Sequence, residues 1–107
     1  MSQLVYKRGI RDEKQEITAL VIRYRLYLAN EYAHCKKEYE RYDFAGSVLN
    51  LTCSSVRAIL HKNPRIRALS KIDCMKELRY RSPLMFTVAE CDITLNKYLD
   101  LIHNDSI

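Results

Sequence analysis

The sequence predicts an all-α protein, a small bundle of about five helices in which the first helix is long. Only two Gly and two Pro occur in 107 residues, which leaves few positions for the tight turns of a many-stranded sheet. Apolar residues make up 48% of the chain and charged residues 29%, a balance typical of folded globular proteins. The apolar residues recur mostly at steps of three and four, the spacing of a helical face. A chain of this length forms one domain, here residues 1–107.

A long amphipathic helix is predicted over residues 11–42, because no Gly or Pro interrupts this stretch. Its polar face would carry Arg23, Arg25 and Glu31, and its apolar stripe is rich in tyrosine. Such a helix would be about 45 Å long, longer than the domain needs, so it either breaks near Asn30 or pairs with a second chain. The stripe supplies the candidates for dimerisation, which are Tyr24, Leu28, Tyr32, Cys35 and Tyr39. Residues 3–8, before Gly9, form either a short strand or an unstructured arm.

Two short helices are predicted over residues 44–62. Asp43 is a candidate N-cap for a helix that begins at Phe44. Asn50 fits a left-handed turn position, since Asn tolerates positive φ better than most residues. Thr52 is a candidate N-cap for the second helix, which runs to Lys62. The inward residues of this second helix are expected to be Val56, Ile59 and Leu60.

Two more helices are predicted toward the C-terminus, over residues 70–81 and 87–103. Each begins with a capping box, Ser70 to Asp73 in the first and Thr87 to Glu90 in the second. Residues 88–102 can also be aligned on residues 46–60 as a second pair of helices. The uninterrupted apolar spacing and acidic charge of residues 88–102 favour a single helix instead.

The stretch FAGSVLNLTCSSVRAIL, residues 44–60, resembles the helix-turn-helix of bacterial and phage DNA-binding regulators, whose pattern is roughly A-x-x-L-G-L-S-x-x-T-V-x-x-x-L. Gly46 stands where a small residue lets the two helices approach, Asn50 where Gly is usual, and Thr52 at the N-cap. The resemblance covers a module and points to no particular family. It implies that the second helix enters the major groove of DNA. The candidate DNA-binding residues are Cys53, Ser54, Ser55, Arg57, His61, Lys62, Arg65 and Arg67.

The charge distribution favours double-stranded DNA as the partner. Eight basic and two acidic residues give residues 57–81 a net charge of +6, within a chain of net charge +5. Arg57 is the best candidate to contact guanine, and the later basic residues would contact phosphates. A homodimer is expected, because half-sites are usually read in pairs. Two alternatives stay open: an RNA-binding protein, and a helical interaction module, an adaptor or inhibitor that grips another protein through its tyrosine-rich face.

Several other classes of function are disfavoured. The sequence contains no catalytic or phosphate-loop motif, so we expect neither an enzyme nor a cofactor. The four cysteines lie 17 to 21 residues apart, without the spacing of a metal site. With no apolar run long enough for a membrane span and no secretory signal, a cytoplasmic location with free thiols is expected. A reactive thiolate at Cys53, favoured by a helix N-terminus and Arg57, is the less common alternative to an inert thiol.

Overall fold

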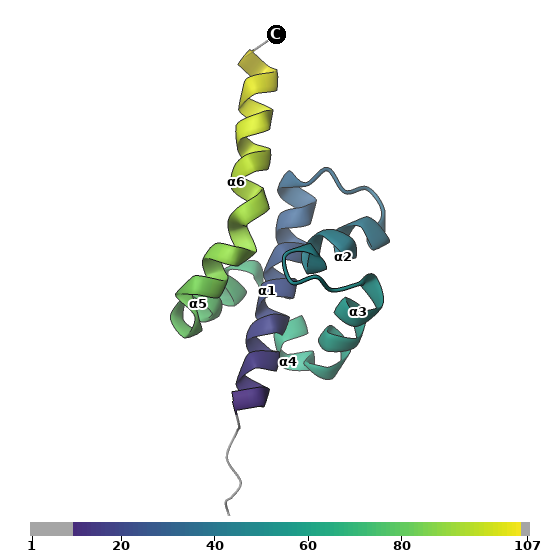
Figure 1. Ribbon diagram of the computed structural model, residues 1–107, viewed down its shortest axis with the longest axis vertical. Coiled ribbons are helices and arrows are strands. Elements are labelled where there is room, and N and C mark those ends of the chain that lie inside the picture. Colours follow the sequence, from purple (N-terminus) through teal and green to yellow (C-terminus); the bar gives the residue numbers. More distant parts are fainter. Residues whose placement is uncertain (1–9, 106–107) are drawn as a thin grey trace, which may run out of the picture.

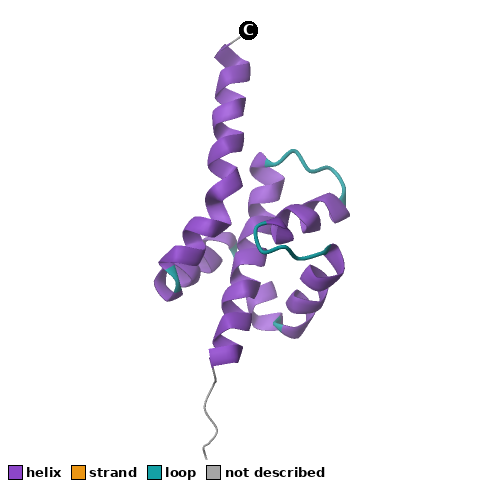
Figure 2. Cartoon of the chain, viewed as in Figure 1, coloured by secondary structure: helices purple, strands orange, loops and turns teal. Residues whose placement is uncertain are grey.

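The computed structural model describes the backbone of residues 10–105 and the side chains of residues 12–95, and all regular structure in this part is helical. The prediction of an all-α fold is confirmed, with six helices in place of about five (Figures 1 and 2). They are α1 (Ile10–Tyr32), α2 (Glu38–Ser47), α3 (Cys53–Lys62), α4 (Pro64–Arg67), α5 (Lys71–Arg81) and α6 (Pro83–Asp105). The strand or arm expected at residues 3–8 lies outside the described residues.

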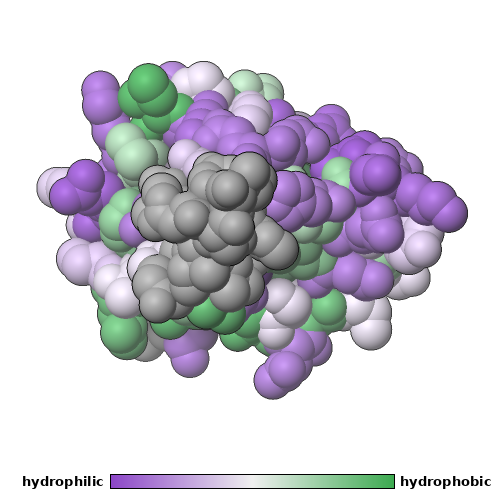
Figure 3. Space-filling model, turned by 90° about the horizontal axis from the view of Figure 1, so that it is seen from above, coloured by the Kyte–Doolittle hydropathy of each residue, from purple (hydrophilic) through white to green (hydrophobic). Residues whose placement is uncertain are grey.

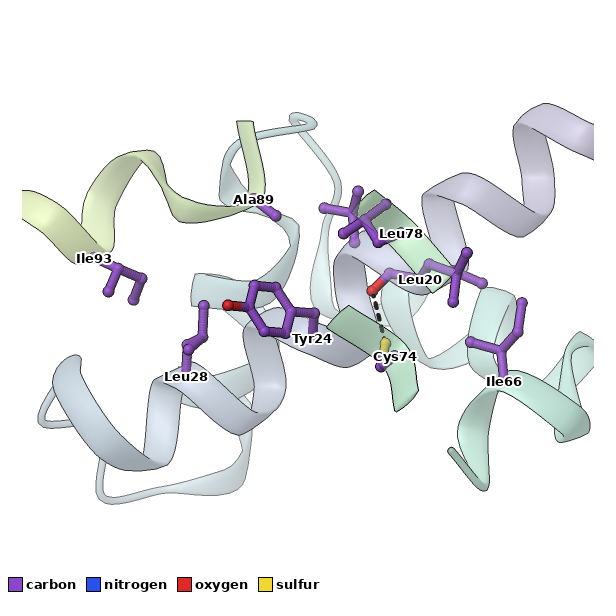
Figure 4. Packing of buried hydrophobic residues seen from close by; sticks show 10 residues of the cluster. Leu20, Tyr24, Leu28, Ile66, Cys74, Leu78, Ala89 and Ile93 are labelled. Atoms are coloured by element: carbon purple, nitrogen blue, oxygen red, sulfur yellow. Dashed lines mark hydrogen bonds between the residues drawn. The ribbon is translucent and has the colours of Figure 1, made fainter. Parts of the chain in front are cut away.

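Helix α1 lies at the centre, with α2 and α3 on one side and α5 and α6 on the other (Figure 1). Leu20, Tyr24 and Leu28 pack in one buried cluster with residues of α4, α5 and α6, drawn in Figure 4. Ile22 and Leu26 form a second cluster with α2 and α3. A helix covered on two sides is apolar around most of its circumference, which accounts for the uninterrupted apolar run at residues 19–22.

The core also encloses one thiol. Cys74 of α5 is fully buried, and its Sγ donates a hydrogen bond to the carbonyl of Leu20 at 3.3 Å (Figure 4). Burial raises the pKa of Cys74 to about 12, because the thiolate would lose its hydration. This cysteine is therefore a packing residue of the α1–α5 contact.

Arg25 is fully buried, although the sequence placed it on the polar face of the first helix. Its Nε and Nη2 both donate to the carbonyl of Phe44, at 3.2 and 2.9 Å. Its Nη1 donates to the carbonyl of Ala89 at 2.6 Å, and Nη2 also reaches the Asp92 carboxylate at 3.1 Å. Burial lowers the pKa of Arg25, and Asp92 opposes this effect. A buried cation is tolerated only when its donors are satisfied, so Arg25 ties α1 to both α2 and α6.

The helix predicted over residues 11–42 is two helices in the structure. α1 ends at Tyr32, two residues after Asn30, near which a break was one of the two alternatives, and α2 begins at Glu38. Residues 33–37 connect them, and His34 within this connection has a φ of 55°. A left-handed non-glycine residue interrupts a right-handed helix without Gly or Pro, so no helix-breaking residue in the sequence marks the position of the break.

The start of α2 also differs from the prediction. Asp43 lies inside α2 and is not an N-cap, since the helix begins at Glu38, six residues before the predicted start at Phe44, with Lys37 at the N-cap position. Glu40 supplies the missing acceptor, because its Oε1 accepts hydrogen bonds from the backbone N–H groups of Lys36 and Lys37 at 2.9 and 2.8 Å. These two bonds lower the pKa of Glu40 and satisfy free donors at the helix start.

The C-terminal helices agree with the sequence in part. Ser70 caps α5 as predicted, its hydroxyl accepting from the Asp73 N–H at 3.1 Å. α6 begins at Pro83 and not at Thr87, whose hydroxyl donates to the Pro83 carbonyl at 3.2 Å; proline is well suited to a first helical turn. α6 is continuous, so the single-helix interpretation of residues 88–102 is confirmed. Among its described side chains Ala89 and Ile93 are buried.

The end of α6 runs beyond the rest of the bundle (Figure 1). Leu95, the last residue whose side chain is described, is 57% exposed. None of the helices in the described part combines the length and the apolar character needed to span a bilayer.

Candidate nucleic-acid interface

The turn between α2 and α3 has the local features that the sequence predicts. Asn50 has a φ of 56°, the left-handed conformation expected of it. The backbone N–H groups of Leu49 and Leu51 both donate to the carbonyl of Gly46 at 3.0 Å, which closes the end of α2. Thr52 then caps α3, its hydroxyl oxygen accepting from the Ser55 N–H at 3.2 Å. The turn and the cap are thereby confirmed.

Gly46 is the point at which the two helices come closest. A Cβ atom at this position would lie 2.7 Å from Cγ2 of Val56 and 2.8 Å from the backbone oxygen of Leu51. Real carbon atoms do not approach so closely, so only glycine fits here without a shift of α3. The role expected of a small residue at this position is confirmed.

Helix α3 has one buried and one exposed face. Val56 is fully buried and Leu60 is 4% exposed, and both pack with Ile22 and Leu26 of α1. Ile59, the third residue predicted to point inward, is half-buried. The exposed positions follow steps of one, three and four and lie along one face of the helix: Ser54, Arg57, Ala58, His61 and Lys62.

Cys53 and Ser55, two predicted DNA contacts, bind within the protein. The Sγ of Cys53 donates to the Asp43 carboxylate at 3.1 Å and to the carbonyl of Tyr39 at 3.2 Å. The hydrogen bond to Asp43 raises the pKa of Cys53, which favours the inert thiol over the reactive thiolate. Ser55 is half-buried and hydrogen-bonded to Thr52. Both side chains support the start of α3.

Arg57 extends from the exposed face of α3 toward α2. Its Nη2 lies 3.0 Å from Oε1 of Glu38, and its guanidinium carbon lies 4.6 Å from the centre of the Tyr42 ring. The side chains of Arg57 and Glu38 are 52% and 58% exposed. An ion pair this open to water is weak and exchanges readily for another anion. Tyr42 therefore supports the guanidinium while leaving it free to change partners.

Arg65 and Arg67 differ in their surroundings, although both were predicted to contact DNA. Arg65 makes a bidentate ion pair with Glu77 of α5, at 3.1 and 2.7 Å. This pairing lowers the pKa of Glu77 and neutralises Arg65. Arg67 is exposed and lines the same cleft as Arg57 and His61 of α3. Of the two, only Arg67 offers an unpaired charge within the described residues.

The predicted dimerisation residues do not form one exposed surface. Tyr24 and Leu28 are each 2% exposed in the core, and the Tyr24 hydroxyl donates to Glu90 at 2.8 Å. Tyr32 and Cys35 are half-buried, while Tyr39 is 52% exposed. The tyrosine stripe is used mainly to pack the domain itself, because α1 is covered on both sides.

A cleft of about 450 Å³ opens beside the exposed face of α3, between α1, α2, α3 and α4. The cationic or titratable residues that line the cleft are Arg23, Arg57, His61 and Arg67. The other lining residues are Leu26, Tyr42, Ala58 and Leu60. From the sequence, Arg23 was expected only to lie on a polar helix face. No local pattern indicates which residues of other helices it contacts. Seen from above, hydrophilic side chains dominate the side of the molecule on which α2 and α3 lie (Figure 3).

The described side chains contain no group of three or more His, Cys, Asp and Glu arranged to hold a metal ion. Comparison with protein-family models, with curated proteins and with solved structures finds no match to this chain.

Proposed function

We propose that the protein is a sequence-specific DNA-binding regulator of transcription and that α3 is its recognition helix. The observation that carries this proposal is the exposed face of α3, with Ser54, Arg57, Ala58, His61 and Lys62 along it. The opposite face is fixed to the core by Val56 and Leu60. A helix held in this way can enter the major groove as a rigid element.

The side chains on this face suit base recognition. Arg57 has the planar, forked donor set that binds O6 and N7 of guanine. Ala58 offers a methyl group for contact with the methyl group of thymine. Ser54 and His61 carry small polar groups that reach base edges or phosphates. These contacts give the proposed sequence preference.

Flanking cations supply the affinity that does not depend on sequence. Lys62 ends α3 and Arg67 ends α4, and both are exposed. Each would contact a phosphate beside the groove and release a counterion. Arg65 is left out of this set because Glu77 already binds it. Occupancy of a promoter site would then be the regulatory step, without catalysis.

The proposed regulator is a homodimer, since one module covers only half of a typical operator. We place its dimer contact on the part of α6 that extends beyond the bundle. Leu95 is exposed there, and Tyr98 and Ile102 continue its spacing in the sequence. Light scattering of the Leu95→Glu variant tests this contact, since a dimer should become a monomer.

The proposed function is tested by titrating the protein with duplex DNA and with single-stranded RNA at about 50 and 200 mM salt. Binding to duplex DNA that weakens steeply with salt and exceeds RNA binding supports the proposal. Preference for RNA indicates the RNA-binding class instead, and no binding to either contradicts any role with nucleic acid.

A helical interaction module is the second candidate function, and one observation favours it. Tyr80, Leu84 and Ile72, on α5 and the start of α6, are 89%, 73% and 57% exposed. Large exposed apolar side chains are frequent at protein contacts. If this is the functional surface, Tyr80→Ser with Leu84→Ser abolishes partner binding, and Arg57→Ala leaves it unchanged.

A further inference from the structure

The cleft between α1, α2, α3 and α4 brings cationic side chains together from three helices. Arg23 comes from α1, Arg57 and His61 from α3, and Arg67 from α4. The three arginines carry a charge of +3, and Glu38, the ion-pair partner of Arg57, carries −1. The net charge at the cleft is therefore +2 when the histidine is counted as neutral. The volume of about 450 Å³ lies within the range of pockets that bind small molecules.

Two of these arginines lack an acidic partner in the part of the chain that the structure describes. Within the described residues, neither Arg23 nor Arg67 has a carboxylate within 4.0 Å. By contrast, Arg25, Arg57, Arg65 and Arg81 all form ion pairs. Convergent cations without anions create a positive potential that attracts an anionic ligand.

Arg23 also has an unused donor. Its Nη2 donates to the hydroxyl of Tyr27 at 2.8 Å, and its guanidinium carbon lies 4.4 Å from the centre of that ring. Its Nε is buried and has no hydrogen-bond partner among the described residues. A buried donor without an acceptor is unfavourable, so a small rotation that gives it an anionic oxygen would stabilise the protein.

We propose that this cleft binds the phosphate monoester group of a small organic phosphate. Arginine binds phosphate oxygens through two parallel hydrogen bonds, and a monoester carries up to two negative charges near neutral pH. Arg23 is half-buried on α1, so a ligand must reach inward. A terminal phosphate can do this, whereas a phosphodiester is tethered on both sides. Tyr42, Leu26 and Leu60 supply apolar surface for the organic part.

This inference stands without the proposed function, but the two surfaces overlap. Arg57, Ala58 and His61 belong both to the exposed face of α3 and to the cleft. If both proposals hold, the ligand and DNA compete for the same protein, which would make the ligand an effector that releases DNA.

The test uses three probes that differ only at the phosphate: AMP, a monoester; cyclic AMP, a diester; and adenosine, with no phosphate. Calorimetry on the full chain at low salt measures their binding. We expect AMP to bind at least about tenfold more tightly than the other two, since only AMP has a terminal phosphate. Arg23→Gln and Arg67→Gln should each weaken AMP binding about fivefold or more. Lys76→Gln, an exposed residue of α5, is the charge-matched control and should change it less than about twofold.

Three results would overturn the proposal: no AMP binding by the wild-type protein, equal binding of AMP and adenosine, or equal effects of the Lys76→Gln and Arg67→Gln substitutions. Thermal unfolding confirms that each variant is folded, and the exposed Arg67 provides a readout if Arg23→Gln is unstable. Titration of the same wild-type sample with duplex DNA separates the two proposals. If the protein binds DNA but not AMP, only the proposed phosphate site in the cleft is contradicted. If it binds AMP but not DNA, only the proposed function is contradicted.

Discussion

Arg57 on α3 and Glu38 at the start of α2 form an ion pair of 3.0 Å at the surface proposed to bind DNA. The carboxylate occupies the guanidinium that would otherwise contact a base, and it adds a negative charge that repels phosphate. Exposed pairs of this kind contribute little to folding. Glu38 is therefore expected to restrain binding more than it stabilises the domain.

Replacement of Glu38 by Gln should increase the affinity for duplex DNA about twofold to fivefold, because Arg57 is freed and one repulsive charge is removed. The matched control is Glu31→Gln, since Glu31 pairs with Lys71 of α5, away from α3. Fluorescence anisotropy with a labelled duplex measures both. An equal gain from both substitutions would mean that only net charge matters, and the role given to the Arg57–Glu38 pair would be wrong.

Gly46→Ala should destabilise the domain by about 1–3 kcal/mol. Alanine is the better helix former by about 1 kcal/mol, but its Cβ would lie 2.8 Å from the backbone oxygen of Leu51, which cannot move without moving the turn. Urea unfolding measures the change. In the double variant with Val56→Ala, part of the clash is removed, so its destabilisation should be smaller than the sum of the two single changes. A stabilised Gly46→Ala variant would contradict the close approach of α2 and α3.

Arg25→Met should cost roughly 3 kcal/mol, because the carbonyls of Phe44 and Ala89 lose the three hydrogen bonds that Arg25 donates to them. Asp92 is 48% exposed and stays hydrated when Arg25 is removed. Asp92→Asn should therefore cost less than about 1 kcal/mol. Chemical denaturation of the two variants checks the order. Equal losses would show that the ion pair, and not the pair of carbonyl contacts, is the main contribution of Arg25.

The ion pair between Glu77 and Arg65 predicts that the protein loses stability in acid. The pKa of Glu77 is lowered in the folded protein, first by its hydrogen bonds with Arg65. A lowered folded pKa means that the stabilisation is complete above the unfolded pKa and is lost as the pH falls through the folded pKa. The wild-type protein should thus lose more stability between about pH 7 and pH 3 than Glu77→Gln does. Urea midpoints at the two pH values test this, and equal losses in both proteins would contradict it.

Local signals in the sequence were sufficient for α3 and its turn. Asn50, Thr52 and Val56 each have a role set by neighbours a few residues away, namely a left-handed turn, an N-cap and an inward position. The same holds for Ser70, which caps α5. Such roles depend on backbone geometry that a short stretch of sequence determines.

Tertiary partners were not predictable in this way. Arg25 resembles any charged residue on a helix until α2 and α6 enclose it. Arg65 was expected to contact phosphate because nothing local shows that Glu77, twelve residues later, lies beside it. The length of the helix predicted over residues 11–42 made a break near Asn30 one of two alternatives. No local residue marks its position, since a left-handed His34 replaces the Gly that usually marks a helix end.

The most direct test of the proposed function compares two double variants that remove the same charge. Arg57→Ala with Lys62→Ala changes the exposed face of α3, and Lys76→Ala with Arg79→Ala changes exposed residues of α5. Affinity for a duplex site is measured as salt is raised from about 50 to 200 mM. The account predicts that only the α3 variant loses affinity, by about tenfold or more, and that its salt dependence falls by about one counterion, because Lys62 contacts a phosphate and Arg57 a base. Equal losses from the two variants, or none from the α3 variant, would contradict α3 as the recognition helix.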